Sequence, residues 1–256
     1  MITANDLSIG YRNKSGDTCI ASSINLEIEE GELVGLIGVN GVGKSTLLRS
    51  LSGVQPYLNG EVSILNKNLQ KLSSEELAKT ISVVLTEQPI SKNLSVSELI
   101  ALGRQPYTNW IGSLSKEDRK KIQTSIELVN IEALKDKRCF ELSDGQLQKV
   151  LIARALAQDT PFIILDEPTT HLDMYHQAYV LKLLKKLTQE TNKSILFATH
   201  EINLALQLCD KIIIMENDKV IAGSPKELIE KNAFSNIFPS DLIYFDNESV
   251  SFKIRT

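Results

Sequence analysis

The chain has 256 residues, enough for one large hydrophobic core or two small ones. Its formal charge of −4, from 28 basic and 32 acidic residues, gives no reason to expect a nucleic-acid-binding surface. No secretory signal is visible and no apolar run approaches the ~18 residues of a membrane span, so we expect a cytoplasmic protein. Cys19, Cys139 and Cys209 lie far apart with no metal-ligand spacing, which indicates buried or functionally indifferent thiols.

The N-terminal part of the chain alternates strand-like segments with turns. Ile2–Tyr11 and Thr18–Ile28 are predicted strands, separated by a polar turn. Leu33–Ile37 is a short apolar run typical of a buried strand, and Thr46–Leu51 after it is predicted to be helical. Glu61–Leu65 is predicted to be a further strand.

The segment between the buried strand and the helix carries the clearest chemical signal. Gly38–Thr46 reads Gly-Val-Asn-Gly-Val-Gly-Lys-Ser-Thr, a complete phosphate-binding loop in the strand–loop–helix setting that the motif requires. Its glycines let backbone N–H groups cradle phosphate oxygens at a helix N-terminus. Lys44 is predicted to reach the β- and γ-phosphates, and the Ser45 hydroxyl to bind Mg²⁺. The alternative is a glycine-rich turn that matches by chance.

The middle of the chain is predicted to be helical, with three clear helix starts. Ser73, Ser95 and Ser115 each precede an acidic residue by three positions, which is capping-box spacing. We expect the second of these helices to end at Gly103.

After residue 155, strands and helices alternate. Phe162–Leu165, Ser194–Thr199 and Lys211–Met215 are predicted strands, and a helix over about 174–190 and another from Glu201 separate them. This βαβ rhythm favours a parallel sheet covered by helices.

Two predicted strands end in residues suited to catalysis. Asp166 and Glu167 close an apolar strand, where parallel sheets bind ligands. Asp166 is predicted to hold Mg²⁺ beside Ser45, and Glu167 to deprotonate an attacking water. His200 follows the next strand and is predicted to reach the γ-phosphate. The alternatives are that the acids cap the following helix and that the histidine is structural.

A second anion-binding element lies far from the first. Leu142–Gln146 reads Leu-Ser-Asp-Gly-Gln and opens a predicted helix that runs to about Gln158, with Ser143 as its N-cap. An exposed Ser–Gly element at a helix N-terminus can bind an anion, although it is equally read as a capped helix start. A chain with two such elements either folds both onto one nucleotide or offers one to a neighbouring subunit.

The order and spacing of these motifs resemble the ATP-binding cassette (ABC) ATPases over nearly the whole chain, from residue 2 to about 230. Gly38–Thr46 resembles the family's Walker A motif, Phe162–Glu167 its Walker B motif and Leu142–Gln146 its signature motif. His200 is similar to the switch histidine, and Gln88 to the Q-loop glutamine that touches Mg²⁺ and the membrane partner.

The resemblance implies ATP and Mg²⁺ as cofactors and a role for each site residue. The implied catalytic residues are Glu167, His200, Lys44 and Gln88. The implied nucleotide-binding residues are Tyr11, Gly38, Asn40, Gly41, Gly43, Lys44, Ser45, Thr46, Ser143, Gly145 and Gln146. The implied metal-binding residues are Ser45, Gln88 and Asp166. Tyr11 is similar to the family's adenine-stacking aromatic residue, and its alternative is a surface tyrosine.

The signature motif departs from the family pattern at two positions. Asp144 stands where glycine is common, and Leu147 where a basic residue often follows the motif. A carboxylate near a triphosphate is repulsive unless it points away, so we expect Asp144 to face solvent or a partner subunit.

The fold implied by the resemblance is α/β: a P-loop NTPase with a RecA-like parallel sheet core, an N-terminal antiparallel β subdomain and a helical signature subdomain. We expect a single ABC ATPase domain over residues 1–240, with the helical subdomain at about 89–157. Residues 241–256 are expected to form a short C-terminal β-hairpin extension.

The resemblance also implies partners. In the family two cassettes pack head to tail, so a second copy of the chain would cover the nucleotide with its signature motif. Ser95–Tyr107, with Trp110 and Asp166–Asp173, resembles the importer ATPases for iron–siderophore, haem and cobalamin. That group implies that the chain binds multi-span permease subunits and lies peripherally at the cytoplasmic face of the cell membrane. A substrate-binding protein would be an indirect partner, and no nucleic-acid partner is expected. A soluble ABC ATPase or an exporter subunit is the alternative, and Tyr107 and Trp110 could instead be packing residues.

Overall fold

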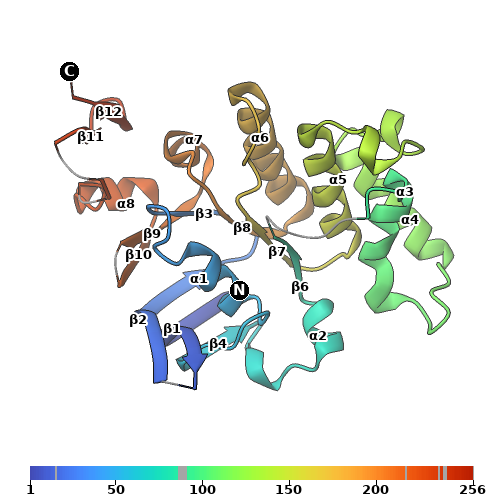
Figure 1. Cartoon of the computed structure of the whole chain (residues 1–256), viewed down its shortest axis with the longest axis horizontal. Helices are drawn as coiled ribbons and strands as arrows, with labels where there is room; N and C mark the ends of the chain where they lie inside the picture. Colours follow the sequence, from blue (N-terminus) through green and yellow to red (C-terminus); the bar gives the residue numbers. More distant parts are fainter. Residues whose placement is uncertain (15, 86–90, 217, 236, 239–240, 256) are drawn as a thin grey trace.

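The computed structural model describes the chain except for residues 15, 86–90, 217, 236, 239–240 and 256 (Figure 1). Its central sheet contains, from edge to edge, β10 (Lys219–Gly223), β9 (Lys211–Glu216), β3 (Leu33–Ile37), β8 (Ser194–Ala198), β7 (Phe162–Asp166) and β6 (Ile81–Val84). The pairs from β9 to β6 are parallel, and β10 is antiparallel to β9. Each residue of β3, β7 and β8 is buried, as expected for parallel strands covered on both faces.

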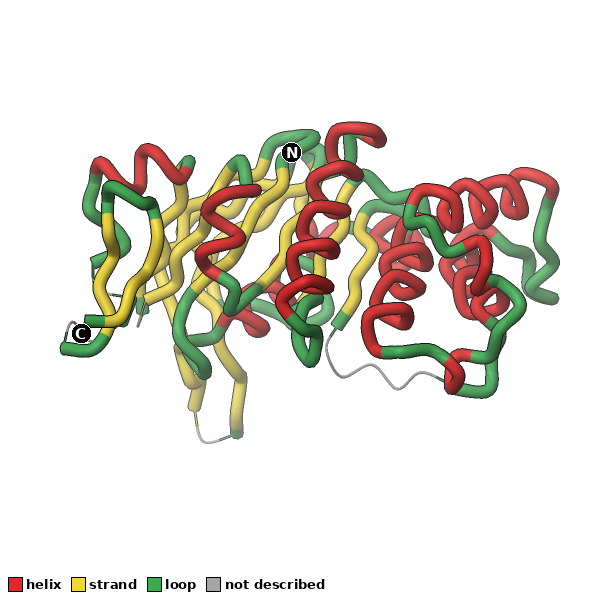
Figure 2. The backbone as a smooth tube through the Cα atoms, turned by 90° about the horizontal axis from the view of Figure 1, so that it is seen from above, coloured by secondary structure: helices red, strands yellow, loops and turns green. Residues whose placement is uncertain are grey.

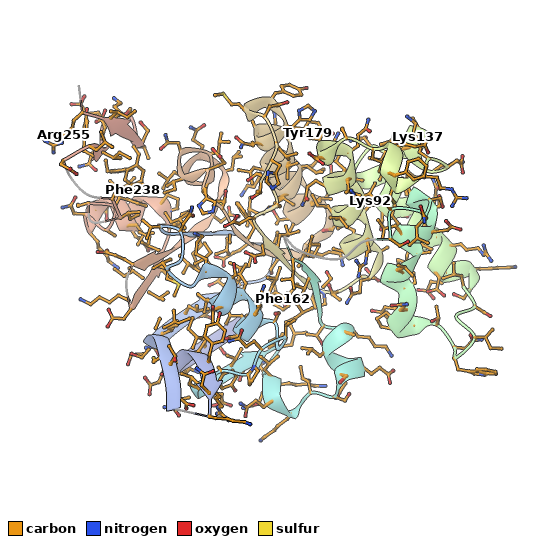
Figure 3. The ribbon with its side chains drawn as sticks, viewed as in Figure 1. Lys92, Lys137, Phe162, Tyr179, Phe238 and Arg255 are labelled. Carbon is orange, nitrogen blue, oxygen red and sulfur yellow. The ribbon has the colours of Figure 1, made fainter. Side chains whose placement is uncertain are left out.

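One face of the central sheet is covered by a second, antiparallel sheet and by the helix after the phosphate-binding loop. The second sheet runs in the order β2 (Gly16–Ile28), β1 (Ile2–Asn13), β4 (Asn59–Ile64) and β5 (Lys67–Asn68). Helix α1 (Lys44–Leu51) lies between the two sheets, where Leu47, Leu48 and Leu51 are fully buried. The same apolar cluster includes Phe162, which Figure 3 labels near the centre of the molecule.

Most other helices gather on the other face and at one end of the sheet (Figure 2). They are α3 (Val96–Ala101), α4 (Lys116–Leu128), α5 (Asp144–Ala157), α6 (Met174–Thr191), α7 (Ile202–Leu208) and α8 (Pro225–Glu230). Helix α2 (Ser74–Ala78) lies on the side of the antiparallel sheet, where Leu77 packs against the same apolar cluster as α1. Short 3₁₀ turns cover Leu69–Lys71, Leu102–Tyr107, Glu132–Leu134 and Cys139–Glu141. The chain ends in a hairpin of β11 (Ile243–Asp246) and β12 (Ser251–Ile254).

The helix starts predicted from the sequence are confirmed. The hydroxyls of Ser73, Ser95, Ser115 and Ser143 each accept a hydrogen bond from the backbone N–H three residues on, and each serine's own backbone N–H donates to the side chain of that residue, which completes a capping box. The helix end predicted at Gly103 is confirmed to within two residues: α3 ends at Ala101, with Leu102 as its C-cap, and a 3₁₀ turn continues to Tyr107. The glycine also permits close packing, because a Cβ there would lie 2.3 Å from the Arg154 carbonyl oxygen.

Besides the two-residue strand β5 and the 3₁₀ turns, three described elements were not predicted from the sequence. Strand β6 was included in the helical region, and β10 and α8 were not recognised. All three are four to six residues long, which is too short for their periodicity to stand out.

A buried ion pair joins the elements of the helical region. Arg104 donates to Asp118 at 2.8 Å and to the Ala157 carbonyl at 2.7 Å, and both charged side chains are 5% exposed. The Ser115 hydroxyl also donates to Asp118, at 2.6 Å. This hydrogen bond, helped by the one from Arg104, lowers the pKa of Asp118.

We predict that Asp118→Asn lowers the free energy of unfolding by about 3 kcal/mol at neutral pH, because Arg104 loses its buried counter-charge. The carboxyl's folded-state pKa lies below its usual 3.8, so its stabilisation is complete above that pH and is lost as the pH falls through the folded-state value. Urea unfolding should therefore show the deficit shrinking below pH 4. Glu75→Gln, at an exposed pair with Lys79, is the control and should change little. An equal deficit at pH 3 and pH 7 would contradict the prediction.

Candidate functional site

The predicted site residues meet at one edge of the central sheet. Strands β3, β8 and β7 are neighbours and run parallel, so their C-terminal ends lie at the same edge. The phosphate-binding loop follows β3, His200 follows β8, and Asp166 and Glu167 close β7. Ligands bind at this edge in parallel sheets.

The phosphate-binding loop folds around its own lysine. The side chain of Lys44 is buried, and its Nζ donates to the carbonyl oxygens of Gly38 at 2.9 Å and Val39 at 3.2 Å. Burial lowers the pKa of Lys44, and the nearby carboxylates oppose this shift. Gly43 has a φ of 109°, and a Cβ there would lie 2.4 Å from the Ile20 side chain. The loop therefore requires glycine at this position.

A hydroxyl and a carboxylate meet beside this lysine. Ser45 Oγ donates to Asp166 Oδ1 at 3.1 Å, linking the start of α1 to the end of β7. Asp166 is 5% exposed, and this burial raises its pKa, while the hydrogen bond from Ser45 acts in the opposite direction. The two oxygen-bearing groups are of the kind that Mg²⁺ prefers.

The carboxylate of Glu167 is held at both oxygens. His200 Nε2 lies 2.5 Å from Oε1, and Thr170 Oγ1 donates to Oε2 at 3.1 Å. The backbone of Glu167 has a φ of 51°, a strained conformation for a residue other than glycine. The contact with Thr170 was not predicted, and only the three-residue spacing could have suggested it.

A hollow of about 460 Å³ lies in front of the loop. Tyr11 forms part of its wall, is 45% exposed and shares a hydrogen bond of 3.1 Å with Thr46. The residues that line the hollow are Tyr11, Ile20, Asn40, Gly41, Gly43, Lys44, Ser45, Thr46, Glu167 and His200. The structure thus brings together most of the residues predicted to bind nucleotide.

The Leu142–Gln146 element lies elsewhere. It does not contribute to the lining of that hollow in the described part of the chain. Ser143 is exposed and caps α5, and its backbone N–H donates to the Gln146 side chain at 3.1 Å. Gly145 is buried, and a Cβ there would lie 3.1 Å from the His176 ring of α6.

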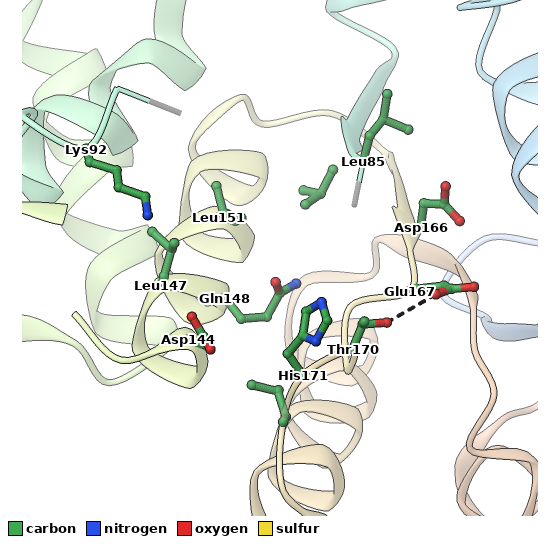
Figure 4. A pocket seen from close by; sticks show the side chains of 12 residues that line it. Leu85, Lys92, Asp144, Leu147, Gln148, Leu151, Asp166, Glu167, Thr170 and His171 are labelled. Carbon is green, nitrogen blue, oxygen red and sulfur yellow. Dashed lines mark hydrogen bonds between the residues drawn. The ribbon is translucent and has the colours of Figure 1, made fainter. Parts of the chain in front are cut away.

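The two unusual residues of this element have local explanations. Asp144 is exposed, as expected, and stands in the first turn of α5, where the helix dipole favours an acid. Figure 4 shows it across a second hollow from Glu167 and Thr170, on the same side as Lys92. Leu147 lies half-buried against the apolar core, which accounts for an apolar residue at its position.

Gln88 lies outside the described residues. Two aromatic residues follow it in the segment up to residue 110. The ring of Tyr107 packs on the Arg104 guanidinium, whose Cζ lies 3.9 Å from the centre of the tyrosine ring. Trp110 is 95% exposed and is therefore not a packing residue.

Two further searches covered the described residues only. Within them, no group of three or more His, Cys, Asp and Glu side chains could hold a metal ion. None of the helices found there combines the length and the apolar character needed to cross a membrane.

Comparisons with known proteins extend these observations. Residues 21–170 match the protein family described as ABC transporter. An uncharacterized ABC transporter ATP-binding protein of Methanocaldococcus jannaschii is 41% identical over 239 residues, which cover 93% of this chain and 81% of that protein. The iron(3+)-hydroxamate import ATP-binding protein FhuC of Bacillus subtilis is 34% identical, with 94% and 88% covered. The ferric enterobactin transport ATP-binding protein FepC of Escherichia coli is also 34% identical, with 91% and 84% covered.

A solved structure agrees with the fold. A dimeric ATP-binding cassette in a post-hydrolysis state, bound to ADP and Pi, matches with a TM-score of 0.75 at 30% identity, covering 88% of this chain and 99% of that one. The predicted fold class, a parallel α/β core with an antiparallel subdomain and a helical region, is confirmed. The chain therefore belongs to the ABC transporter family and is one of its nucleotide-binding, ATP-hydrolysing cassettes.

Proposed function

We propose that this cassette powers the import of an iron–siderophore complex through a membrane permease. The observation that carries the proposal is the group of Lys44, Ser45, Asp166, Glu167 and His200 at one sheet edge, which can bind and hydrolyse ATP. Two relatives that match over most of the chain are named for hydroxamate and enterobactin transport, which supports the siderophore class. Neither of these relatives is named for haem or cobalamin.

ATP is proposed to occupy the hollow beside the loop. Its phosphates would lie on the backbone N–H groups of the loop and on Lys44, and its adenine against the ring of Tyr11. The donor set fits Mg²⁺, because Ser45 and Asp166 already bring a hydroxyl and a carboxylate oxygen together. Gln88 is proposed as a further ligand. When bound, the ion would neutralise phosphate charge.

Glu167 is proposed to accept the proton of the attacking water. Its carboxylate is held by Thr170 and His200, so its position is fixed before the reaction. His200 and Lys44 are proposed to stabilise the negative charge of the terminal phosphate as it leaves.

A second copy of the chain is proposed to complete the site. Ser143 and Gly145 lie apart from the hollow of their own chain, and Ser143 is exposed, as a contact to another subunit requires. Gln146 holds the backbone of this element through the capping box. The dimeric state of the similar cassette supports this arrangement.

The permease is proposed to dock on the helical region, with the cassette peripheral at the cytoplasmic face of the membrane. Gln88 and the exposed Trp110 are the proposed contacts. We propose one ATPase domain over residues 1–240, its helical subdomain at about 89–157, and a hairpin extension over 241–256. A substrate-binding protein would act only through the permease.

The experiment that tests the transport function is uptake of labelled iron in a strain that lacks this cassette. Ferric hydroxamate and ferric enterobactin are supplied separately, and uptake is compared with that of the strain carrying the gene. Loss of uptake with either chelate, restored by the gene, is expected. If the strain that lacks the cassette takes up both iron chelates normally but accumulates a compound that the strain carrying the gene exports, the exporter alternative is favoured.

We predict that Glu167→Gln lowers the ATPase kcat by about 100-fold or more, because the amide cannot accept the proton. ATP binding should be retained, and size-exclusion chromatography should show an ATP-dependent dimer. Glu190→Gln, at an exposed position near the end of α6, is the matched control and should behave as wild type. Hydrolysis at the normal rate by the Glu167 variant would show that another group is the base.

We predict that Tyr11→Ala raises the Kd for ATP about tenfold, because base–aromatic stacking is lost. Tyr11→Phe keeps the ring and removes only the hydroxyl that contacts Thr46, so its Kd should stay within about twofold of wild type. Fluorescence titration with a labelled ATP analogue measures both. Equal weakening by the two variants would show that the hydroxyl, and not the ring, supports binding.

A further inference from the structure

The C-terminal hairpin is fastened to helix α7 by one side chain. Asn203 Oδ1 accepts a hydrogen bond from the Phe252 backbone N–H at 2.8 Å, and its Nδ2 donates to the Phe252 carbonyl at 3.4 Å. The asparagine thus pairs with the backbone of β12 as a neighbouring strand would. These two bonds join a helix of the core to a segment about 50 residues further along the chain.

An aromatic cluster also holds the hairpin in place. The rings of Phe234 and Phe245 stack at 4.6 Å, and Phe252 lies 5.1 Å from both Phe245 and Phe238. Phe234 is fully buried and belongs to the main apolar core. Stacked and edge-to-face rings at these distances fix the position of the hairpin on the core. Helix α7, which is bonded to the hairpin through Asn203, therefore packs against a segment of defined position.

Helix α7 begins directly after His200. The backbone N–H of Ile202, the first residue of the helix, donates to the His200 carbonyl at 3.0 Å, so the histidine backbone is bonded to the start of α7. Asn203 stands only three residues beyond the histidine. A hollow of about 230 Å³ has His200 on one side and Lys253 and Ile254 of the hairpin on the other.

This helix depends on its neighbours for its position. It has seven residues, too few to be stable alone, and its N-cap residue Glu201 makes no side-chain capping bond. On its inner face, Ile202, Ala205 and Leu206 are buried against the core. On its outer face, Asn203 holds the hairpin.

We propose that the C-terminal hairpin is a positioning element for His200, and that Asn203 is the residue through which it acts. By fixing the outer face of α7, the hairpin holds the start of the helix and keeps the imidazole on the Glu167 carboxylate. This inference rests on the proposed catalytic role of His200. The hairpin itself touches no reacting group, so it acts only through the helix.

The first test is kinetic, on the full chain. Asn203→Ala should lower the ATPase kcat about tenfold and leave the KM for ATP unchanged, because the displaced histidine serves hydrolysis and not binding. Asn203→Asp keeps the acceptor for the Phe252 N–H and should restore most of kcat. Asn247→Ala, the same substitution at the exposed turn of the hairpin, is the matched control and should leave kcat unchanged.

The second test is a double-mutant cycle with His200→Ala. If the hairpin acts through the histidine, Asn203→Ala should cause no further loss of kcat in the His200→Ala background. An equal fold-loss in both backgrounds would overturn the proposal. If His200→Ala alone leaves ATP hydrolysis intact, the proposed role of His200 fails, and the third test still decides whether the hairpin positions the ring.

The third test is spectroscopic and does not depend on catalysis. The chain has only three histidines, so its imidazole Cε1–H signals are few, and that of His200 is identified by its loss in His200→Ala. Asn203→Ala should shift the His200 signal and leave those of His171 and His176 in place. An unshifted His200 signal in a folded Asn203→Ala protein overturns the proposal.

Discussion

The site depends on the register of three parallel strands. Ala198 of β8 pairs with Leu36 of β3 on one side and with Asp166 of β7 on the other, so all three strands end at the same level. The ladder continues past the strand ends, where the backbone N–H of Glu167 donates to the Ala198 carbonyl and that of Thr199 to the Leu36 carbonyl. A shift of one residue would turn the inward side chains outward, and no loop adjustment could restore the group.

Two charged side chains at this edge of the sheet are buried. Lys44 and Asp166 are each 5% exposed, yet neither is isolated: the lysine donates to two carbonyl oxygens and the aspartate accepts from Ser45. Burial is the largest influence on both groups, lowering the pKa of Lys44 and raising that of Asp166, and the opposite charge nearby counteracts each shift. The loop therefore holds its lysine in a defined position through its own backbone, and the phosphate-binding geometry is built into the fold.

The sequence predicted the elements that have strong local signals. Apolar runs marked β3, β7 and β8, three serines at capping-box spacing marked helix starts, and Ser143 was recognised as a fourth N-cap, because each signal lies within a few residues. The packing role of Gly103 was not predicted, since it depends on a carbonyl about fifty residues away, which no local pattern reveals. Among the site residues, motif spacing placed Lys44 and Glu167 correctly at the sheet edge. The bond from Thr170 to that glutamate arises from a left-handed backbone turn, which the sequence does not encode visibly.

The glycine in the Leu142–Gln146 element has an electrostatic consequence. With no Cβ at Gly145, the start of α5 lies against His176 in the first turn of α6. Two helix N-termini, each carrying a partial positive charge of about half a unit, therefore lie close together and their fields add. Asp173 caps one of them, and Asp144 stands in the first turn of the other. The acid that looks out of place beside a phosphate-binding element thus serves as a counter-charge to a pair of helix dipoles.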